Sequence, residues 1–473
     1  MVSLGCDKNL VDTEMMLGIL SDKGFVFTDD ETEAKVIVVN TCCFIGDAKE
    51  ESINRLIEYG LLKENGNLDF LIATGCLAQR YHEEIKKDLP EVDAIIGTMS
   101  FDSIAEVINR LYDDSADFNS SINHGDENFG DDSTTPALKP AEEEAANISG
   151  SFDPFVCIED INRALYGRRR ILTGGGHYAY LKIAEGCDKN CTYCCIPKVR
   201  GRYRSFPMET LVSEARELAA GGVRELILVA QETTLYGVDI YGKKSLPELI
   251  RQLEKISGIY WIRLLYCYPE EITGEIAELF SEGGKLIPYI DMPIQHASDD
   301  ILRRMGRHTT GSELSEKIRM LREAVPDICI RTTLITGFPS ETEDDVNILA
   351  DFIEAERFDR LGVFTYSAEE GTPAAGFDGQ IDEDEKERRR GYLMELQQGI
   401  AFEKAEKQKG RILEVMIEGK VSDENVYVAR SYMDAPGIDG LVFVDTDIEL
   451  MTGDFIKVKI TGSYEYDLLA EPV

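Results

Sequence analysis

The sequence predicts an α/β protein of three domains: an N-terminal doubly wound parallel sheet, a central partial barrel of six β/α units, and a small C-terminal antiparallel β-barrel of OB-like type. Three observations predict this fold class. Residues 1–112 alternate short apolar runs with helical stretches, six further strand–helix units follow from Tyr178, and residues 411–473 contain five short strand patterns. The length of 473 residues suits about three domains.

Residues 1–112 are expected to form the first domain. The runs "MVSL", "KVIVVN", "DFLIAT" and "DAIIG" have the short apolar character of buried strands. Between them, "LVDTEMMLGILSDKG" and "AKEESINRLIEYGLLKENG" have helical periodicity, and each ends near a glycine. This alternation predicts a parallel sheet that binds ligands at its carboxyl edge.

Residues 113–153 interrupt the pattern. They contain eleven acidic residues, one lysine and few large apolar residues. Such a composition cannot offset the entropy of ordering, so we expect an acidic disordered linker. A regulatory or docking role for this stretch is the alternative.

Residues 172–402 are expected to form the second domain. Its strand patterns are "YAYLKIA", "ELILVA", "WIRLLYCY", "YIDMPI", "ICIRTTLI" and "RLGVFTY". A closed barrel takes eight units and roughly 250 residues, so six units predict an open-sided barrel with its active site at the carboxyl ends of the strands. A charged helix at about 382–409 leads into the third domain, residues 404–473, whose five short strands predict a small barrel.

The chain is strongly acidic, with 50 basic against 88 acidic residues and a net charge of −38. Such a surface lacks the basic footprint of non-specific nucleic-acid binding and attracts basic partners. The sequence contains no run of roughly 18 apolar residues, which a membrane helix would need, and nothing in it resembles a signal peptide. We expect a cytoplasmic protein that binds no membrane and has no nucleic acid as its direct substrate.

Three of the eleven cysteines, Cys187, Cys191 and Cys194, directly follow the first barrel strand. Clustered cysteines in a reducing compartment predict metal ligands or catalysts rather than disulfides. A structural zinc site usually has four ligands, whereas three thiolates suit a cubane iron–sulfur cluster with one open iron. Zinc remains the alternative. Five other cysteines are expected to be ordinary buried side chains: Cys43, Cys157, Cys195, Cys267 and Cys329.

A second set, Cys6, Cys42 and Cys76, lies in the first domain. Each follows a predicted strand. Because parallel strands end at one edge of the sheet, these three cysteines should converge there. The sequence therefore predicts a second three-thiolate cluster, although chance placement after three strands is the alternative.

The segment "EGCDKNCTYC" resembles the radical S-adenosylmethionine (SAM) superfamily, whose mark is CxxxCxxC after the first strand of a partial barrel. The resemblance implies that the open iron binds SAM and that an electron from the cluster cleaves SAM to a 5′-deoxyadenosyl radical. Tyr193 would then contact the adenine. Weaker candidates for SAM contacts are Gln231 and Glu232 on the amino group, together with Gln295 and Gly337.

The whole chain outside the acidic stretch resembles the methylthiotransferases. The signatures are "SLGCDKNLVD", "VNTCCFI", "TGCLAQRY", "HYAYLKIAEGCDKNCTYC" and "PIQHAS". The family pattern assigns Cys6, Cys42 and Cys76 to an auxiliary cluster, and the last domain to the TRAM type. Cys43 and Cys195 stand where the family usually has small or aliphatic residues, and either could compete as a ligand.

The family has two main branches. One, the MiaB type, modifies an adenosine of transfer RNA, and the other, the RimO type, modifies the β-carbon of an aspartate in ribosomal protein S twelve. "LGCDKN" and "ARSYMDAPGIDG" are similar to RimO-type signatures. Residues 411–473 carry five basic and thirteen acidic side chains, which favours a basic protein over RNA as the partner. Four acids are predicted to dock the substrate: Asp434, Asp439, Asp445 and Asp447.

The resemblance implies two [4Fe–4S] clusters, with SAM as both methyl donor and radical source. It also implies an electron donor and a sulfur source as partners. A radical suits the reaction because the β-carbon of aspartate carries no proton that an ordinary base could remove. A non-catalytic electron carrier with two clusters is the alternative from a different class, although carriers keep their irons fully ligated.

Overall fold

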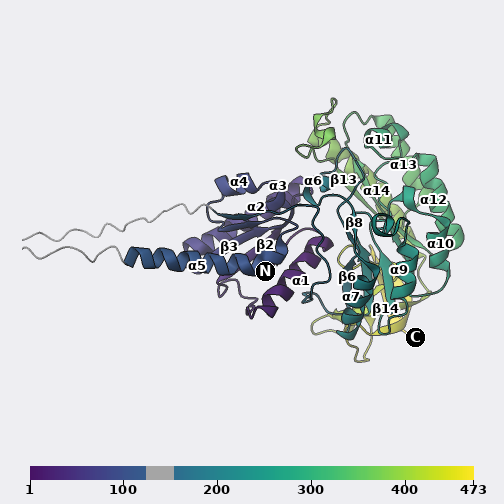
Figure 1. Ribbon diagram of the computed structural model, residues 1–473. Coiled ribbons are helices and arrows are strands. Elements are labelled where there is room, and N and C mark those ends of the chain that lie inside the picture. The colour runs from purple at the N-terminus through teal and green to yellow at the C-terminus, as the bar shows by residue number, and fades with distance from the viewer. Residues whose placement is uncertain (124–153) are drawn as a thin grey trace, which may run out of the picture.

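The computed structural model describes residues 1–123 and 154–473 of the chain. Figure 1 shows an N-terminal sheet domain beside a larger unit, in which the barrel and the C-terminal strands pack together. Helix α1 (Asp7–Asp22) lies at the boundary between the sheet domain and the barrel. The three predicted domains are present, and the boundary between the first two is where the predicted cysteine sets lie.

The N-terminal sheet has five parallel strands in the order β1-β2-β3-β4-β5. The strands are β1 (Val2–Ser3), β2 (Val36–Thr41), β3 (Phe70–Thr74), β4 (Ala94–Ile96) and β5 (Phe155–Cys157). The other helical segments are α2 (Gly46–Glu64), α3 (Gly75–Arg80), α4 (His82–Asp88), η1 (Phe101–Ser103) and α5 (Ile104–Asn123). The four predicted strands and the parallel arrangement are confirmed.

Two features of the first domain differ from the prediction. The disordered stretch was expected to begin at residue 113, but α5 continues to Asn123. The chain then returns to the same sheet, because β5 pairs with β4 as a fifth strand. The prediction missed β5 because three residues are too few to show a period. The rest of the predicted linker, residues 124–153, lies outside the described residues.

The central domain is an open sheet of six parallel strands in the order β13-β12-β11-β10-β9-β6, as predicted. The strands are β6 (Tyr178–Lys182), β9 (Glu225–Val229), β10 (Trp261–Leu264), β11 (Leu286–Asp291), β12 (Cys329–Thr336) and β13 (Arg360–Thr365). A short antiparallel ribbon, β7 (Ala184–Glu185) with β8 (Arg204–Ser205), flanks the cysteine loop and was not predicted.

Helices cover the outer face of this sheet (Figure 1). They include α7 (Met208–Ala220), α9 (Leu246–Leu253), α10 (Gly274–Ser281), α12 (Gly311–Ala324), α13 (Glu343–Glu356) and α14 (Glu383–Glu406). The other helical segments of this domain are α6 (Ile196–Val199), which packs on the N-terminal domain, α8 (Val238–Tyr241), α11 (Asp299–Arg304), η2 (Pro269–Glu271) and η3 (Pro373–Gly376). The predicted charged helix is α14.

The two faces of each barrel strand pack against different partners because successive side chains alternate. Leu226 and Leu228 of β9 join the core under the helices. Ile227 and Val229 of the same strand share a hydrophobic cluster with the C-terminal domain. The C-terminal domain therefore covers the inner face of the open barrel.

The C-terminal domain is a closed five-stranded barrel in the order β14-β15-β16-β18-β17, as predicted. The strands are β14 (Ile412–Lys420), β15 (Val426–Ser431), β16 (Val442–Asp445), β17 (Phe455–Tyr464) and β18 (Asp467–Pro472). One neighbouring pair, β16 with β18, is parallel, and the other four are antiparallel. Among the described residues, none of the helices combines the length and apolar character needed to cross a membrane.

Candidate active site

The first cysteine set lies at the carboxyl edge of the N-terminal sheet. Strands β1, β2 and β3 are neighbours in register, with Asn40 of β2 opposite both Ser3 and Thr74. Cys42 follows β2 directly, Cys6 precedes α1, and Cys76 lies in the first turn of α3. The strand ends thus bring together three cysteines that are far apart in the sequence.

The thiols of this set lie close to one another. Gly5 has a φ of +83°, and a Cβ added there would lie 2.7 Å from the Cys42 sulfur, so only glycine fits. The pKa of Cys76 is raised to about 12, mainly by burial and in part by the neighbouring Cys42 and Cys6, while the Arg200 charge opposes the shift. Thiols this hard to ionise must lose their protons to a metal when they ligate it. The donor set suits a three-thiolate group.

The second set lies in the loop after β7. The backbone N–H of Lys189 donates to the Cys187 sulfur at 3.4 Å, and the Cys191 sulfur lies 3.7 Å from the Tyr268 hydroxyl. Burial raises the pKa of Cys187 to about 12, and Cys191 adds to this effect. Burial also raises the pKa of Cys194, and the neighbouring Cys191 and Cys187 contribute to this increase. These three thiols also form one group.

No three His, Cys, Asp or Glu side chains among the described residues form a site for a single metal ion. A four-iron cluster holds its thiolates further apart than one ion does, since four irons and four sulfides lie between them.

Three predicted SAM contacts carry buried oxygens that lack a hydrogen-bond partner: Gln231 Oε1, Glu232 Oε2 and Gln295 Oε1. Gln231 and Glu232 follow β9, and Gln295 follows β11, so all three lie at the carboxyl ends of the barrel strands. Unsatisfied buried acceptors are uncommon in native proteins and indicate a missing donor. The amino group of SAM would supply such donors, so this site fits SAM.

Glu232 lies within electrostatic reach of the Cys187 thiol. Burial raises the pKa of Glu232 to about 7, against weaker opposing effects from Thr234 and Lys189. A buried carboxyl group whose pKa lies near 7 is only partly ionised at neutral pH, and a bound cation would stabilise its charged form. The predicted contact with a positively charged amino group is chemically consistent with this.

A buried polar network joins the two cysteine sets, and the sequence prediction missed it. Arg200 is 1% exposed and donates to Asp12 at 2.6 Å, to Glu185 at 3.3 Å and to Asn9 Oδ1. Lys182 pairs with the same two carboxylates, at 2.8 Å for Glu185. Asp12 and Asn9 belong to α1, whereas the other three belong to the barrel domain.

Both ends of this network reach the predicted ligand sites. The Cys76 thiol donates to Asn9 Oδ1 at 3.7 Å, the same oxygen to which Arg200 donates, and Gln231 donates to Glu185 at 2.7 Å. The only signal in the sequence is the spacing of Asn9 and Asp12, which places two polar residues on one helix face. The network fixes the first cysteine set relative to the predicted SAM site.

Three family models match the chain in the order that the fold shows. They are an uncharacterized protein family, UPF0004, over residues 1–97, the radical SAM superfamily over 181–353, and the TRAM domain over 410–473. A ribosomal protein uS12 methylthiotransferase RimO of Lachnoclostridium phytofermentans is 54% identical, covering 99% of this chain and 98% of that protein. A RimO of Clostridioides difficile is 46% identical, covering 99% and 97%.

The chain belongs to the RimO family of radical SAM methylthiotransferases. Among solved structures, the radical SAM methyltransferase TsrM of Kitasatospora setae is similar in fold, with a TM-score of 0.50 and 15% identity, covering 77% of this chain and 71% of that one. At this identity, the likeness concerns the fold alone.

The two remaining predicted SAM contacts are Tyr193 and Gly337. Tyr193 is partly buried between the Cys191 thiol and a small hydrophobic cluster that includes Phe338. Gly337 has a φ of +76°, and a Cβ added there would lie 2.3 Å from Lys386 Cγ. Packing of Lys386 therefore already explains this glycine without a ligand.

The RimO-type docking acids divide into two pairs. Asp434 is 1% exposed and pairs with Arg360 at 2.5 Å, while the Asp439 side chain is 3% exposed and accepts from the Tyr289 hydroxyl at 2.7 Å. Both therefore bind the barrel, and their predicted docking role is wrong. Asp445 and Asp447 are exposed on the C-terminal domain and remain available to a partner.

Five cysteines outside the two sets were expected to be ordinary buried side chains, and four of them are buried. Cys43, Cys195, Cys267 and Cys329 are buried, and Cys157 is half-buried on β5. Cys43 and Cys195 belong to one hydrophobic cluster, although each neighbours a predicted ligand in sequence. Burial raises the pKa of Cys195 to about 11, in the same direction as for the predicted ligands, so its packing rather than its pKa separates it from them.

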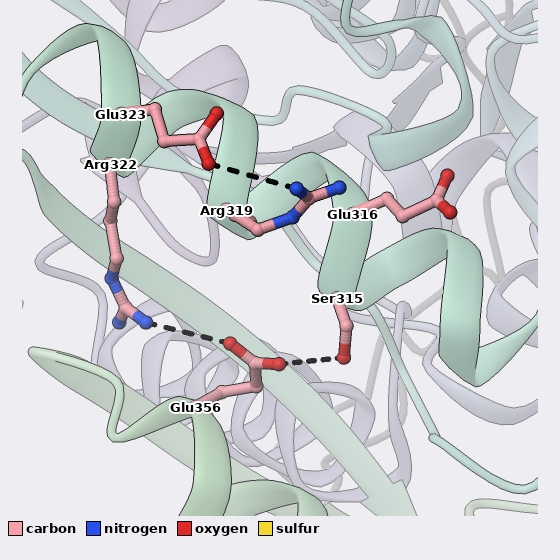
Figure 2. Close-up of a pocket in the computed structure, with 6 residues that line it drawn as sticks. All are labelled: Ser315, Glu316, Arg319, Arg322, Glu323 and Glu356. Carbon is pink, nitrogen blue, oxygen red and sulfur yellow. Dashed lines mark hydrogen bonds and ion pairs between the residues drawn. The ribbon is translucent and has the colours of Figure 1, made fainter.

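A hollow of about 460 Å³ lies away from the strand ends, between α12 and α13 (Figure 2). Its charged side chains pair with each other, Arg319 with Glu323 at 3.7 Å and Arg322 with Glu356 at 3.5 Å. Figure 2 shows Ser315 also directed toward Glu356. These pairs leave no reason to place the active site there.

Proposed function

We propose that this chain transfers a methylthio group to the β-carbon of an aspartate in ribosomal protein uS12, the S twelve protein of the small ribosomal subunit. The strongest support is the full-length similarity to uS12 methylthiotransferases, at up to 54% identity. The net reaction replaces one hydrogen on that carbon by a methylthio group. We place the enzyme in the cytoplasm, where ribosomal proteins are made.

We infer that each cysteine set holds one [4Fe–4S] cluster. The auxiliary cluster would be held by Cys6, Cys42 and Cys76, and the SAM-binding cluster by Cys187, Cys191 and Cys194. When bound, the two clusters and SAM supply the sulfur, the methyl group and a radical that can remove hydrogen from an unactivated carbon. An electron donor and a sulfur source are needed as partners.

The protein's own residues orient and shield these groups. Glu232, Gln231 and Gln295 would accept hydrogen bonds from SAM with their unpartnered oxygens, and Tyr193 would pack on its adenine. Arg200 donates to Asn9 and Asp12 of α1, and Asn9 contacts the Cys76 thiol, so this network fixes the first set relative to the barrel. Cys42, Cys76, Cys187 and Cys191 are buried, which limits water around both sets and protects a radical from side reactions, whereas Cys6 is exposed.

Mass spectrometry of uS12 tests the proposal most directly. Cells with the gene should contain uS12 with one aspartate gaining a methylthio group in place of hydrogen, and cells without the gene should lack it. Methylthioadenosine in tRNA should be the same in both. A change in the tRNA alone would contradict the proposal, and reduced protein that cannot cleave SAM would indicate an electron carrier.

A further inference from the structure

Lys8 is a buried cation at the boundary between the N-terminal domain and the barrel. It lies two residues after Cys6 and is 5% exposed. Its ammonium nitrogen lies 3.2 Å from the centroid of the Tyr266 ring, which follows β10 at the carboxyl end of the barrel. Tyr266 also lies within electrostatic reach of Cys6. The ammonium is thus beside the first cysteine set and inside the barrel mouth.

Tyr266 adopts an uncommon backbone conformation. Its φ is +59°, in the left-handed region that a bulky side chain rarely occupies. Asp291 holds it there by accepting the Tyr266 backbone N–H at 3.0 Å. Such outliers persist where the surrounding structure enforces them, commonly at ligand sites. Here the conformation keeps the ring against Lys8.

Asp7 shows that a carboxylate fits between these two side chains. Its Oδ1 lies 2.9 Å from the Lys8 ammonium and accepts from the Tyr266 hydroxyl at 3.3 Å. Its Oδ2 is buried without a hydrogen-bond partner. The Asp7 carboxylate is therefore only partly satisfied, so another carboxylate could compete for the same donors.

Lys8 differs from three other cations at the boundary between the N-terminal domain and the barrel. Arg200 and Lys182 each pair with two carboxylates, and Arg331 pairs with Asp291 at 2.8 Å and Asp439 at 3.5 Å. In the described part of the chain, the one carboxylate paired with Lys8 is its sequence neighbour. An ammonium has three donors, so it can bind a second carboxylate.

We propose that Lys8 and the Tyr266 hydroxyl bind the side-chain carboxylate of the substrate aspartate, and that Asp7 occupies this position until the substrate arrives. The inference rests on the proposed function and adds the residues that recognise the substrate. The β-carbon is bonded directly to the carboxylate carbon, so holding the carboxylate fixes the reacting carbon beside the first cysteine set and inside the barrel mouth. The positive charge selects an acidic residue.

The test measures binding of purified uS12 to the anaerobically reconstituted full-length enzyme, with a second uS12 in which the modified aspartate is Asn. Wild-type enzyme should bind the Asp form more tightly. Lys8→Met should remove this preference and raise the KM for uS12 roughly ten- to hundredfold, because a charge-assisted hydrogen bond is lost. Lys8→Arg should retain most of the preference.

Asp7→Asn provides a second test, in which the KM for uS12 should change in the opposite direction. Removing the internal competitor should lower the KM for uS12 by about threefold or more and sharpen the preference for the Asp form. A purely structural role for the Asp7–Lys8 pair predicts that both variants weaken binding. Iron content and melting temperature, measured for each variant, report whether the cluster site stays intact.

Lys49→Met is the matched control. Lys49 lies 4.0 Å from the centroid of the Tyr81 ring, and both residues belong to the N-terminal domain. This variant should leave the uS12 preference unchanged. If wild-type enzyme never modifies uS12, the proposed function fails. If wild-type enzyme modifies uS12 but Lys8→Met keeps the preference, or Asp7→Asn weakens binding, the inference alone is overturned.

Discussion

Individual buried side chains control the charge of the barrel mouth. Glu232 combines a pKa raised to about 7 by burial with an oxygen that no donor in the described residues satisfies. Below this pKa the carboxyl is neutral, and above it the carboxylate can pair with a cation. Its protonation therefore decides how well the mouth of the barrel binds a positively charged amino group.

The first prediction concerns the pH dependence of SAM binding. Between about pH 8 and about pH 6, affinity for SAM should fall, approaching about tenfold per pH unit below the pKa, because protonation removes the carboxylate. Glu232→Gln should bind SAM more weakly and with little pH dependence. Anaerobic calorimetry measures both, and an equal slope in the variant would show that another group titrates.

Arg200 is the residue on which the boundary between the domains depends most. It joins two buried carboxylates from different domains, and replacing it leaves only Lys182 to compensate them. Removing one partner of a buried ion pair typically costs about 3–5 kcal/mol. The neighbouring Arg202 is exposed, so the same substitution there removes a charge at the surface.

The second prediction follows from this difference. Arg200→Met should lower the melting temperature of the protein by several degrees, whereas Arg202→Met should leave it nearly unchanged. In the reconstituted protein, Arg200→Met should also lower the reduction potential of the auxiliary cluster, since a nearby cation favours the more negative reduced state. Equal melting temperatures for the two variants would contradict this account.

At the scale of elements, the C-terminal barrel has one side that binds the partial barrel and another that is free. Arg360 and Asp434 pair across the bound side, together with Arg430 and Glu225 at 2.8 Å. Asp445 at the end of β16 and Asp447 beyond it are exposed. Acidic residues on the free side can attract a basic protein over a distance.

The third prediction separates these two sides. Asp445→Lys with Asp447→Lys should slow the association of uS12 with the full-length enzyme, most strongly at low salt, because charges are screened beyond about 10 Å at 0.1 M. Asp434→Asn should instead destabilise the fold, since Arg360 loses its buried partner. Stopped-flow binding and thermal unfolding measure the two effects. An association rate that the two lysine substitutions leave unchanged would show that uS12 does not dock on this side of the C-terminal barrel.

The elements that the sequence predicted share a strong local pattern. The four apolar residues 226–229 of β9 are all buried, as a continuous apolar run predicts for a parallel strand covered on both faces. The three residues of β5 follow a long acidic stretch and carry no such pattern. The convergence of the cysteines was also predictable, because the ends of parallel strands meet at one edge of the sheet.

Pairings between domains carry no local signal. Arg200 and Asp12 lie 188 positions apart, so no pattern in the sequence connects them. The burial of Asp434 and Asp439 likewise depends on arginines and a tyrosine of another domain. Counting acids in the last domain gave its net charge correctly but could not tell which acids reach solvent.

At the scale of the whole molecule, the two cysteine sets lie at facing edges of two parallel sheets. Each set is complete within its own domain, and the buried network between them belongs to both. The two proposed metal groups should therefore assemble independently, whereas the proposed transfer of sulfur requires both.

The fourth prediction tests this independence. Wild-type protein reconstituted anaerobically should hold about eight irons, and replacing all three cysteines of either set by Ala should leave about four. Neither triple variant should yield methylthio product, and the variant of Cys187, Cys191 and Cys194 should not cleave SAM. Iron analysis and product mass spectrometry report the result. Eight irons in either variant would refute the ligand assignment.

The return of the chain to the N-terminal sheet at β5 affects how the protein is made. Ile96 of β4 pairs with Cys157, so the sheet is completed only after residues 124–153 have been synthesised. Residues 124–153 join two parts of one folding unit rather than two units. A peptide-bond cut within them would leave β5 bound to β4 and α1 bound to the barrel by buried charges. In a split gene, the fragments on either side of this stretch already carry the complementary surfaces needed to reassemble as a heterodimer.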